Sequence, residues 1–513
     1  MSREPTVRRQ DPPSPTTEAD GARGGSYGAR QWAGWLVGPP ALILTLVLPT
    51  PDGLGEAGWR TAGAAVLMAA FWIAESIPIP ATALLPLVLF PALGLGDVRD
   101  TAAPYANPII FLFLGGFIIA LAMQRWQLHR RVAIGLISRL GTRPPAIVAG
   151  FLVSSALISM WVSNTATALM MLPIALSVVR LLPDRARPTR ATRDFSTALL
   201  LAVAYGATSG GMGTLIGTPP NALLAAYVGD IYGLTLGFGQ WMLLGVPIVL
   251  VTVPVVYLVL TRLLFRLDRG ELPGMRALIA REQAQLGPFS RGETAAAVVF
   301  ALTAAGWVFQ PLIARAVPLV TDTMIAMAGA LLLFAVPIDL RRGEFVMSWE
   351  ATEGLPWGVL LLFGGGLSLA GNIERHGVAA YLGSLAGGLA GWPMLLVLAI
   401  VCFGILLLTE LTSNTATAAT FLPITGALAL SLGENPLLFL IPTALAANCS
   451  YMMPVGTPPN AIVYGSGFVP LPAMARAGLV LNVVLVPVLL GLLLLLGPAI
   501  FELEIGVVPS WAR

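Results

Sequence analysis

The sequence predicts an all-α protein that crosses a membrane many times and consists of two related halves. Three observations support this prediction. Hydrophobic residues make up 56% of the 513 residues and charged residues only 11%, whereas a soluble domain has roughly 25% charged residues. Apolar runs of about 17–25 residues recur, and each is long enough to cross a bilayer. One six-residue motif also occurs twice in the chain.

The repeated motif is Ser-Asn-Thr-Ala-Thr-Ala, at residues 163–168 and again at 413–418. Each copy is followed by a second shared motif, Gly-Thr-Pro-Pro-Asn-Ala, at 217–222 and 456–461. Small uncharged polar residues lie here beside helix breakers in otherwise apolar sequence. This pattern indicates a small-ligand site that is formed by two related halves.

The elements follow in order along the chain. Residues 1–30 are rich in Arg, Pro, Thr and Gly and lack apolar periodicity, which predicts a disordered cytoplasmic tail. Apolar runs predict spans at about 34–50, 61–78, 81–95, 107–123, 240–264, 294–314, 322–338, 356–372 and 477–500. Two apolar segments with Ser-Asn-Thr at their middle cover about 145–182 and 392–432. Two interrupted spans with Gly-Thr-Pro-Pro-Asn cover about 195–229 and 436–466.

The first interruption is expected from Gly206 to Pro220, because this stretch is too rich in Gly, Ser, Thr and Pro for an unbroken helix. The polar stretches on either side of the Ser-Asn-Thr segment are expected to be basic loops. The long polar stretch after residue 264 is expected to be a loop as well.

Arg supplies all of the basic charge, and its distribution orients the chain. Both flanks of segment 145–182 are rich in Arg, so both should face the cytoplasm. The segment is then either two full spans with a tight turn or a re-entrant hairpin, and its uncharged tip favours the hairpin. Segment 392–432 has few basic flanks and should enter from the outer face. The count is about 11 transmembrane helices, with a cytoplasmic N-terminus and halves of opposite orientation.

An inverted repeat is typical of transporters that open one central site to either side in turn. If both hairpins reach only midway, their tips meet near the middle of the bilayer. Ser, Asn and Thr are good N-caps for the returning helix, whose N-terminus suits a carboxylate. No Arg lies near either tip, so bound cations would stabilise a dianion, and freed carbonyls could coordinate Na⁺. The alternative is that these polar residues only bond a neighbouring helix.

Two carboxylates at the expected membrane depth leave their roles open. Glu75 lies close to Pro78, so it has either a structural partner or a part in transport. Glu410 precedes Ser413 by three residues, and its counterpart in the first half is the apolar Met160. A structural role or a proton-linked role is consistent with that position.

Other chemistry finds little support in the sequence. Cys402 and Cys449 are isolated in apolar sequence and are expected to pack in the core. His129 and His376 have no partners at metal-ligand spacing, so no metal other than sodium is expected. The chain lacks a phosphate-binding loop and a nucleophile–base pair, which argues against an enzyme and an organic cofactor. Its net charge of +3 is too small to suggest nucleic acid, and the Gly pairs near 115 and 365 are expected to serve close helix packing.

The doubled motifs carry a family resemblance. Ser163-Asn164-Thr165, Ser413-Asn414-Thr415 and the paired Gly-Thr-Pro-Pro-Asn turns resemble the divalent anion/sodium symporter family, which includes the INDY-type dicarboxylate and citrate carriers. The resemblance covers about residues 60–500 and includes the stretches 72–80 and 105–108.

The resemblance implies a homodimer in which a transport domain moves against a scaffold as an elevator. The implied scaffold comprises helices within 31–124, a linker loop and helices within 240–372, and a last helix with the C-terminal tail at 471–513. The implied transport domain comprises 125–239 and 373–470, each with one hairpin and one broken helix.

The resemblance also implies the binding residues, by motif position. Substrate carboxylates would be contacted by Asn164, Thr165, Asn414, Thr415, Thr457 and Pro458, and less strongly by Thr218. One sodium site would use Ser159, Ser163, Asn164 and Gly217. The second sodium site would use Thr409, Thr412, Asn414 and Gly456.

The predicted function is therefore sodium-coupled uptake of C4-dicarboxylates such as succinate, fumarate or malate across a bacterial inner membrane. Three alternatives stay open at this point. The first is a sodium-independent dicarboxylate exchanger on the same fold. The second is a citrate or sulfate carrier, and the third is an anion channel.

Overall fold

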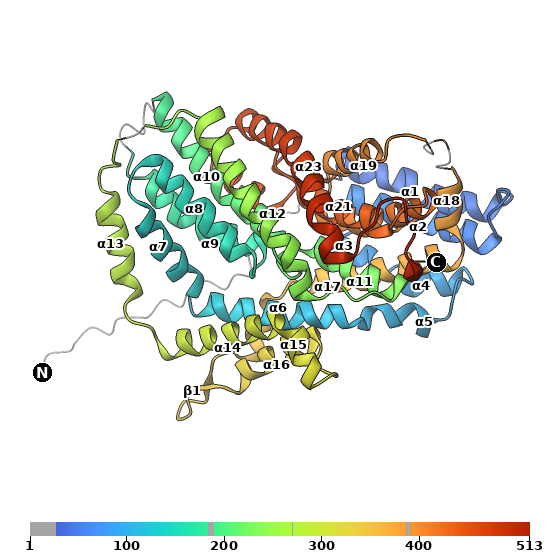
Figure 1. Cartoon of the computed structure of the whole chain (residues 1–513), viewed down its shortest axis with the longest axis horizontal. Helices are drawn as coiled ribbons and strands as arrows, with labels where there is room; N and C mark the ends of the chain where they lie inside the picture. The colour runs from blue at the N-terminus through green and yellow to red at the C-terminus, as the bar shows by residue number, and fades with distance from the viewer. Residues whose placement is uncertain (1–26, 183–188, 269, 386–387, 389–390, 513) are drawn as a thin grey trace, which may run out of the picture.

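The computed structural model describes residues 27–182, 189–268, 270–385, 388 and 391–512. The protein is mainly helical and elongated, with α7–α10 at one end of the long axis and α18 beside the N-terminal helices α1 and α2 at the other end (Figure 1). One short β-hairpin, β1 (Pro337–Asp339) with β2 (Glu344–Phe345), is the exception to the all-α prediction within the described residues. Almost all of the expected disordered tail lies outside the described residues.

The same order of helices occurs twice. The first copy consists of α6 (Pro108–Arg125), α7 (Leu128–Leu140), α8 (Pro144–Ser159), α9 (Asn164–Val179), α10 (Arg190–Gly211), α11 (Pro219–Tyr232) and α12 (Phe238–Leu258). The second copy consists of α17 (Trp357–Arg375), α18 (Val378–Leu385), α19 (Met394–Thr409), α20 (Asn414–Ser431), α21 (Pro436–Asn448), α22 (Pro458–Gly465) and α23 (Leu471–Phe501). The repeat that the motifs predict is thus a repeat of structure.

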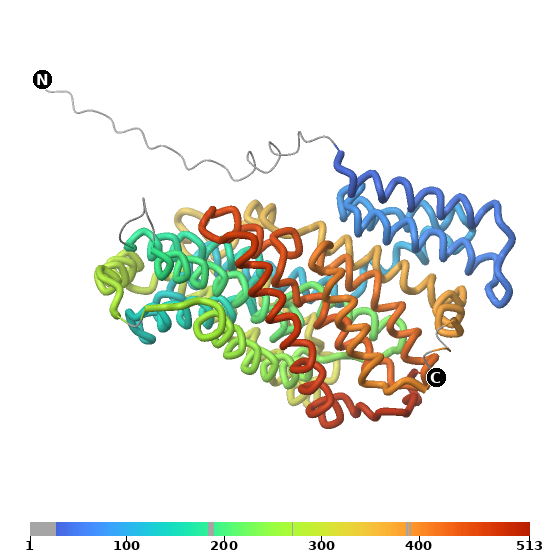
Figure 2. Tube along the Cα trace, turned by 90° about the horizontal axis from the view of Figure 1, so that it is seen from above, coloured from blue at the N-terminus to red at the C-terminus, as the bar shows by residue number. Residues whose placement is uncertain are grey.

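The remaining helices lie outside the two copies. The N-terminal group is α1 (Ala29–Val47), α2 (Glu56–Ala74), α3 (Ile79–Thr82), α4 (Pro86–Ala92) and α5 (Val98–Ala102). The group between the copies is α13 (Met275–Leu286), α14 (Arg291–Val308), α15 (Gln310–Ala316) and α16 (Asp322–Ala335). Helices α1 and α2 pack along each other at one end of the molecule (Figure 2).

Glu75 is explained by this N-terminal pair. It ends α2 in a left-handed conformation with φ of 50°, and its carboxylate pairs with Arg30 of α1 at 3.2 Å. Both side chains are more than one-third exposed. Of the two roles that the sequence leaves open for Glu75, the structure therefore supports the structural one.

Both Ser-Asn-Thr segments form helical hairpins, with α8 and α9 in the first and α19 and α20 in the second. Three of these four helices have 16 residues and α20 has 18. A 16-residue helix is about 24 Å long, shorter than the ~30 Å hydrocarbon layer. The length favours hairpins that stop inside the bilayer, and re-entrance itself stays a prediction.

The start of the first interruption is predicted wrongly. Helix α10 continues through Gly206 and ends only at Gly211, so the break covers residues 212–218. Gly206 and Gly210 face the backbone of α8: a Cβ on Gly206 would come within 2.5 Å of Leu152 O, and one on Gly210 would collide with Ala156 O. Close backbone packing thus stabilises a helix that its Gly content alone disfavours.

Two helices lie in stretches that the sequence suggests are basic loops. One is α7, and the other is α13 in the polar stretch between the halves. Helix α7 buries an apolar face that includes Ala133, Ile134 and Ile137 and carries Arg130 and Arg131 toward the α13–α14 connection. These helices were missed because their Arg content outweighs a narrow apolar stripe.

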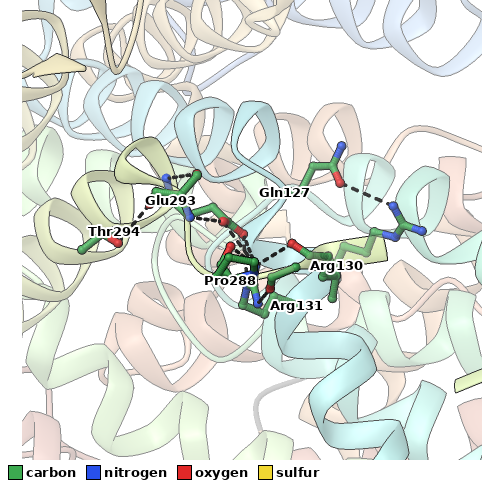
Figure 3. A network of polar contacts seen from close by, with 9 residues as sticks. Gln127, Arg130, Arg131, Pro288, Glu293 and Thr294 are labelled. Atoms are coloured by element: carbon green, nitrogen blue, oxygen red, sulfur yellow. Dashed lines mark hydrogen bonds and ion pairs between the residues drawn. The ribbon is translucent and has the colours of Figure 1, made fainter. Parts of the chain in front are cut away.

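The Arg residues of α7 tie this helix to the connection between the halves (Figure 3). Arg131 pairs with Glu293 at 2.9 Å and also donates to the carbonyls of Leu286 and Gly287. Its guanidinium lies 4.2 Å from the centroid of the Phe289 ring. Arg130 donates to Glu282 of α13 at 2.5 Å. Charge-assisted bonds of this kind fix α7 firmly at the start of the first hairpin.

Five helices among the described residues are long and apolar enough to cross a membrane, or six if the bent pair α14 and α15 forms one span. That pair is bent by 75°. The other predicted spans are short or interrupted helices or, in α1, a 19-residue helix that does not meet the criteria for a span, so the predicted total of about 11 stays a prediction.

The two copies cross each other at the centre. Helix α9 of the first hairpin packs on α22, and α20 of the second hairpin packs on α11. Close packing at glycines joins each copy to helices outside it, as predicted for the Gly pairs. A Cβ on Gly115 would come within 2.8 Å of the Ala326 backbone, and one on Gly365 would collide with Ala83 O.

Candidate functional site

The crossed packing brings the starts of four helices together: α9 and α20 after the hairpin tips, and α11 and α22 after the breaks. Three of these helices begin at predicted site residues, Asn164, Asn414 and Pro458, and α11 begins at Pro219, directly after the predicted Thr218. The nearest Arg residues to the first tip along the chain are Arg143 and Arg180. A helix N-terminus presents free N–H groups and partial positive charge, so the site can attract an anion without a cationic side chain.

At the first tip, local hydrogen bonds set the geometry. Ser163 caps α9, because its hydroxyl accepts from the backbone N–H of Ala166 at 3.3 Å. Ser159, the last residue of α8, donates from Oγ to Asn164 Oδ1 at 2.6 Å. Ser159 is fully buried. The Asn164 Nδ2 group has no hydrogen-bond partner among the described residues and is free to donate to a ligand.

The first break lies against this tip. The Gly211 backbone approaches the Asn164 side chain so closely that a Cβ would collide with Oδ1. Gly217 in turn faces Gly211, since a Cβ on Gly217 would be 2.5 Å from Gly211 O. Thr214 fastens the break to the hairpin, because its hydroxyl donates to Met160 O at 2.5 Å and accepts from Gly217 N at 3.0 Å. The predicted first sodium residues are therefore neighbours in space.

At the second tip, three oxygen atoms surround the side-chain amide of Asn414. The Asn414 Oδ1 atom faces Thr409 Oγ1 at 2.8 Å, Ala447 O at 3.2 Å and Gly456 O at 3.1 Å. Without an ion, these contacts are satisfied if the amide is turned by half a rotation, so that its nitrogen donates to all three. With the amide oxygen toward them, they form an oxygen-only cluster, which is the ligand type that Na⁺ takes from backbone carbonyls.

Ala447 is a member of this cluster that the sequence does not single out. It is the second-last residue of α21, and nothing in its side chain suggests a ligand. Its carbonyl is exposed to the cluster because the helix ends at Asn448 and leaves its last carbonyls without backbone partners. The predicted break could have indicated this ligand, because a helix that ends beside a ligand site leaves its last backbone carbonyls without partners.

Thr412, also predicted for the second sodium site, has a hydroxyl that is already paired. Its Oγ1 lies 2.9 Å from Leu408 O and 2.7 Å from Thr417 Oγ1. Any contribution from Thr412 would therefore come from its backbone carbonyl.

Burial varies within both predicted residue sets and does not separate them. The sodium residues Ser159, Gly217, Thr409, Thr412 and Gly456 are buried. Among the substrate residues, Asn164, Thr165 and Asn414 are partly exposed and Pro458 is exposed. The exposed fraction of Thr415 is 9% and that of Thr457 is 3%.

The threonine hydroxyls of the substrate set also differ. Those of Thr165, Thr415 and Thr457 make no hydrogen bond to any residue that the structure describes. The hydroxyl of Thr218 donates to Asn448 Oδ1 at 2.8 Å. Thr218 is thus the predicted substrate residue whose hydroxyl the fold itself uses.

Glu410 lies beside the second site, buried with 3% exposure. Its carboxylate accepts from the backbone N–H groups of Tyr451, Met452 and Met453 at 2.8–3.0 Å. Asn482 Nδ2 donates to it at 2.7 Å and Ser450 Oγ at 3.3 Å. All five groups donate hydrogen bonds to this carboxylate, which thereby holds the second break in place. Of the roles that the sequence leaves open, the structural one fits this geometry.

A polytopic helical protein with two hairpins and two broken helices around an uncharged polar centre is, by class, a membrane transporter. The chain belongs to the family described as the sodium:sulfate symporter transmembrane region, which matches residues 30–503. The resemblance that the motifs indicate is thereby confirmed. The family is one of transporters and not of enzymes, as the sequence predicts.

Curated relatives cover nearly the whole chain. The sodium-dependent dicarboxylate transporter SdcS of Staphylococcus saprophyticus is 39% identical over 488 residues, which is 94% of this chain and 94% of that protein. SdcS of Staphylococcus aureus strain USA300 is 38% identical over 487 residues, again with 94% of each chain covered.

Solved structures share the fold at low identity. The Alcanivorax borkumensis YdaH transporter has a TM-score of 0.57 and 15% identity, with 86% of this chain and 99% of that chain covered. Neisseria gonorrhoeae MtrF has a TM-score of 0.54 and 12% identity, with 88% and 96% covered. At these identities the likeness concerns the fold alone.

Proposed function

We propose that the protein couples the uptake of C4-dicarboxylates, such as succinate, fumarate or malate, to the entry of Na⁺. The observation that carries this proposal is the convergence of three oxygen atoms, Thr409 Oγ1, Ala447 O and Gly456 O, on the Asn414 side-chain amide. The sodium-dependent dicarboxylate relatives support the choice of ion and substrate. No organic cofactor is part of the proposal.

Two cations would be held by related sets of residues. The first set is Ser159, Ser163, Asn164 and Gly217, and the second is Thr409, Thr412, Asn414 and Gly456, to which we add the carbonyl of Ala447. Each set joins a hairpin tip to the adjacent break. A cation bound there fixes the tip and lowers the electrostatic cost of bringing a dianion beside it.

The dicarboxylate would lie at the helix starts that these sets position. Free donors for its carboxylates are Asn164 Nδ2 and the hydroxyls of Thr165, Thr415 and Thr457, with Asn414 and Pro458 completing the site. Backbone N–H groups at the starts of α9 and α20 add to them. We leave Thr218 out of this set, because its hydroxyl is paired with Asn448.

The movement that we propose is that of an elevator. Residues 125–239 and 373–470 would move together past a scaffold from 31–124, 240–372 and 471–513. The cavity between α6 and α11 supports a sliding boundary there, with a volume of about 540 Å³ and Asn107 donating to Asp230 across it at 2.7 Å. A homodimer in the bacterial inner membrane, with a cytoplasmic N-terminus, completes the proposal.

The first experiment is uptake of radiolabelled succinate into otherwise empty proteoliposomes, with and without an inward Na⁺ gradient. Uptake that requires Na⁺ is the expected result. Uptake that ignores Na⁺ and needs internal dicarboxylate would establish an exchanger instead. Uptake of citrate or sulfate in place of succinate would identify a citrate or sulfate carrier on the same fold.

The site assignment has its own test. Asn164→Ala and Asn414→Ala should each abolish uptake while the purified protein keeps its size and helicity. Asn372→Ala is the control, because Asn372 is also buried but its amide donates only to Ser368 O in its own helix. Normal uptake by both tip variants would show that the site lies elsewhere.

The elevator can be tested across the cavity. Ile109 of α6 and Gly229 of α11 both line it. Cysteines at these positions, in a background without Cys402 and Cys449 and joined across the cavity by a reducible bifunctional thiol reagent, should stop uptake until a reductant is added. Full uptake by the cross-linked protein would exclude relative movement of these two helices.

A further inference from the structure

A buried amide joins the two breaks. Asn448 ends α21, at the edge of the second break, and its Nδ2 donates to Asn221 Oδ1 at 3.0 Å. Its Oδ1 accepts from the hydroxyl of Thr218, which caps α11 after the first break, at 2.8 Å. All three side chains are at most 2% exposed. We call Thr218, Asn221 and Asn448 the amide bridge.

The orientation of the amide bridge is fixed from one end. Asn221 Nδ2 faces three carbonyl oxygens, of Gly211, Met212 and Thr214, at 3.3, 3.4 and 2.9 Å. Its Oδ1 must therefore point to Asn448 and accept a hydrogen bond from the Asn448 amide nitrogen. Asn448 then has only its oxygen left for Thr218. None of these groups can turn without leaving a buried partner unpaired.

Each end of the amide bridge adjoins a predicted cation ligand. Thr218 directly follows Gly217, and Asn221 holds the carbonyl of Gly211, which packs against Gly217. At the other end, Asn448 directly follows Ala447. The Ala447 carbonyl accepts from Thr409 Oγ1 at 2.9 Å and faces the Asn414 amide. A change in position at either cation site is thus passed to the other through one residue.

The repeat does not supply a second bridge. Asn460 is the counterpart of Asn221 in the second copy, and its Nδ2 likewise donates to carbonyls of its own break, those of Ser450 and Met453. Its Oδ1 is buried and has no hydrogen-bond partner among the described residues. Within the described residues, the amide bridge thus has no counterpart in the repeat, although Tyr205 and Ser209 of α10 also bond to Tyr451 in the second break.

We propose that Asn448 is a positioning residue that couples the two cation sites, so that occupation of one raises the affinity of the other for Na⁺. This inference rests on the sodium sites of the proposed function. A cation at the second site fixes the Ala447 carbonyl and with it Asn448. The fixed amide then holds Thr218 and Gly217 in the geometry that the first site needs.

The experiment measures linkage between the sites without substrate. The unfolding temperature of the purified full-length protein is recorded against Na⁺ concentration, with choline chloride keeping the ionic strength constant. Thr409→Ala removes a side chain of the second site. In the wild-type background it should raise the Na⁺ midpoint of the remaining site about 5-fold or more, within the usual range of coupling between ligand sites. In an Asn448→Ala background, Thr409→Ala should no longer raise the Na⁺ midpoint of the remaining site.

Thr218→Val provides a second test, because it removes one hydroxyl and cuts the bridge at its far end while keeping Asn448. Asn372→Ala is the control and should leave the coupling intact. An unchanged shift in both bridge variants would overturn the inference and leave the sodium sites standing. If the wild-type protein shows no stabilisation by Na⁺ over choline, the proposed sodium sites fail, and the coupling fails with them.

Discussion

The two breaks end in the same motif, Gly-Thr-Pro-Pro-Asn-Ala, but are built differently. The first covers residues 212–218, and the Asn221 amide donates to two of its carbonyls, those of Met212 and Thr214, and to that of Gly211 at the end of α10. The second covers residues 449–457, two residues more, because α21 ends at Asn448 and α22 starts at Pro458. Glu410 holds this longer break through three successive N–H groups.

The difference follows from one position in each hairpin. Met160 and Glu410 occupy equivalent places, three residues before the Ser of the tip. Met160 offers only its backbone carbonyl, to Thr214. Glu410 offers a carboxylate, around which the chain unwinds further. A repeated motif thus gives two sites of the same kind, while its surroundings decide how rigid and how accessible each is.

The threonine hydroxyls at the ends of the two breaks differ in the same way. Thr218 of the first copy is used by the fold, whereas Thr457 of the second copy is free. We infer that the first break is mainly a structural support and that the second contributes more of the substrate contacts. The following changes test that contrast.

The largest effect is expected at Glu410. Glu410→Ala leaves three backbone N–H groups, Ser450 and Asn482 without their acceptor in a buried place. Loss of such a network should cost about 3–5 kcal/mol of unfolding free energy and abolish uptake. Thermal unfolding in detergent measures it. Met160→Leu is the matched control, with less than about 1.5 kcal/mol expected; equal melting of both variants would show that the breaks are supported alike.

The glycines of the two sodium sets should respond differently to alanine. In Gly217→Ala, the new Cβ meets the Gly211 backbone oxygen at 2.5 Å, which cannot easily move. Overpacking of about 1–3 kcal/mol should reduce Na⁺-dependent uptake by up to about 100-fold.

In Gly456→Ala, the nearest atom is the Ser450 hydroxyl, and the Glu410 carbonyl follows at 3.0 Å. Because a side chain can give way, the loss should be smaller, and Ser450→Ala should restore part of it. Equal losses for Gly217→Ala and Gly456→Ala, with no restoration, would contradict the difference in rigidity between the breaks.

Thr457→Ala and Thr218→Ala compare the free hydroxyl with the paired one. Loss of one hydrogen bond to a carboxylate should raise the KM for succinate about 10-fold in Thr457→Ala. Thr218→Ala should change KM less than about 3-fold at saturating Na⁺ and instead lower the unfolding temperature. Uptake kinetics and melting, measured side by side, decide between these outcomes, and a reversed order would place the substrate at the first break.

The smallest effect is expected where the hairpins begin. Arg130 and Arg131 anchor α7, while the equivalent positions of α18 hold Ala380 and Tyr381. Arg131→Gln should lower the unfolding free energy by about 1–2 kcal/mol, since this pair is largely buried and bound to several acceptors. Arg342→Gln is the control, because the Arg342–Asp339 pair is exposed. If both variants melt like the wild type, α7 is held by packing alone.

Local patterns account for what the sequence predicts well. The hairpin tips and both motifs are predictable because N-caps and prolines act on their own neighbours in the chain. The extent of α10 is not, because Gly206 and Gly210 owe their helical state to the backbone of α8. Helices α7 and α13 are not predicted, because their Arg residues make these stretches resemble polar loops.

The parts of the site that depend on tertiary contacts are also missed. The pairing of Thr218 with Asn448 spans 230 positions in the chain, and that of Glu410 with Tyr451 spans 41. No spacing rule connects such residues. Ala447 acts through its backbone, which a side-chain pattern does not reveal.

The close contact between α8 and α10 has a consequence for gating. At Gly206 and Gly210 the two backbones touch with no side chain between them, so the first hairpin cannot swing away from the broken helix without opening a void along its length. We expect that tip to be a poor gate and to travel only with its whole domain. The position of that domain in the membrane, and not an opening of the hairpin, would then decide from which side the site is accessible.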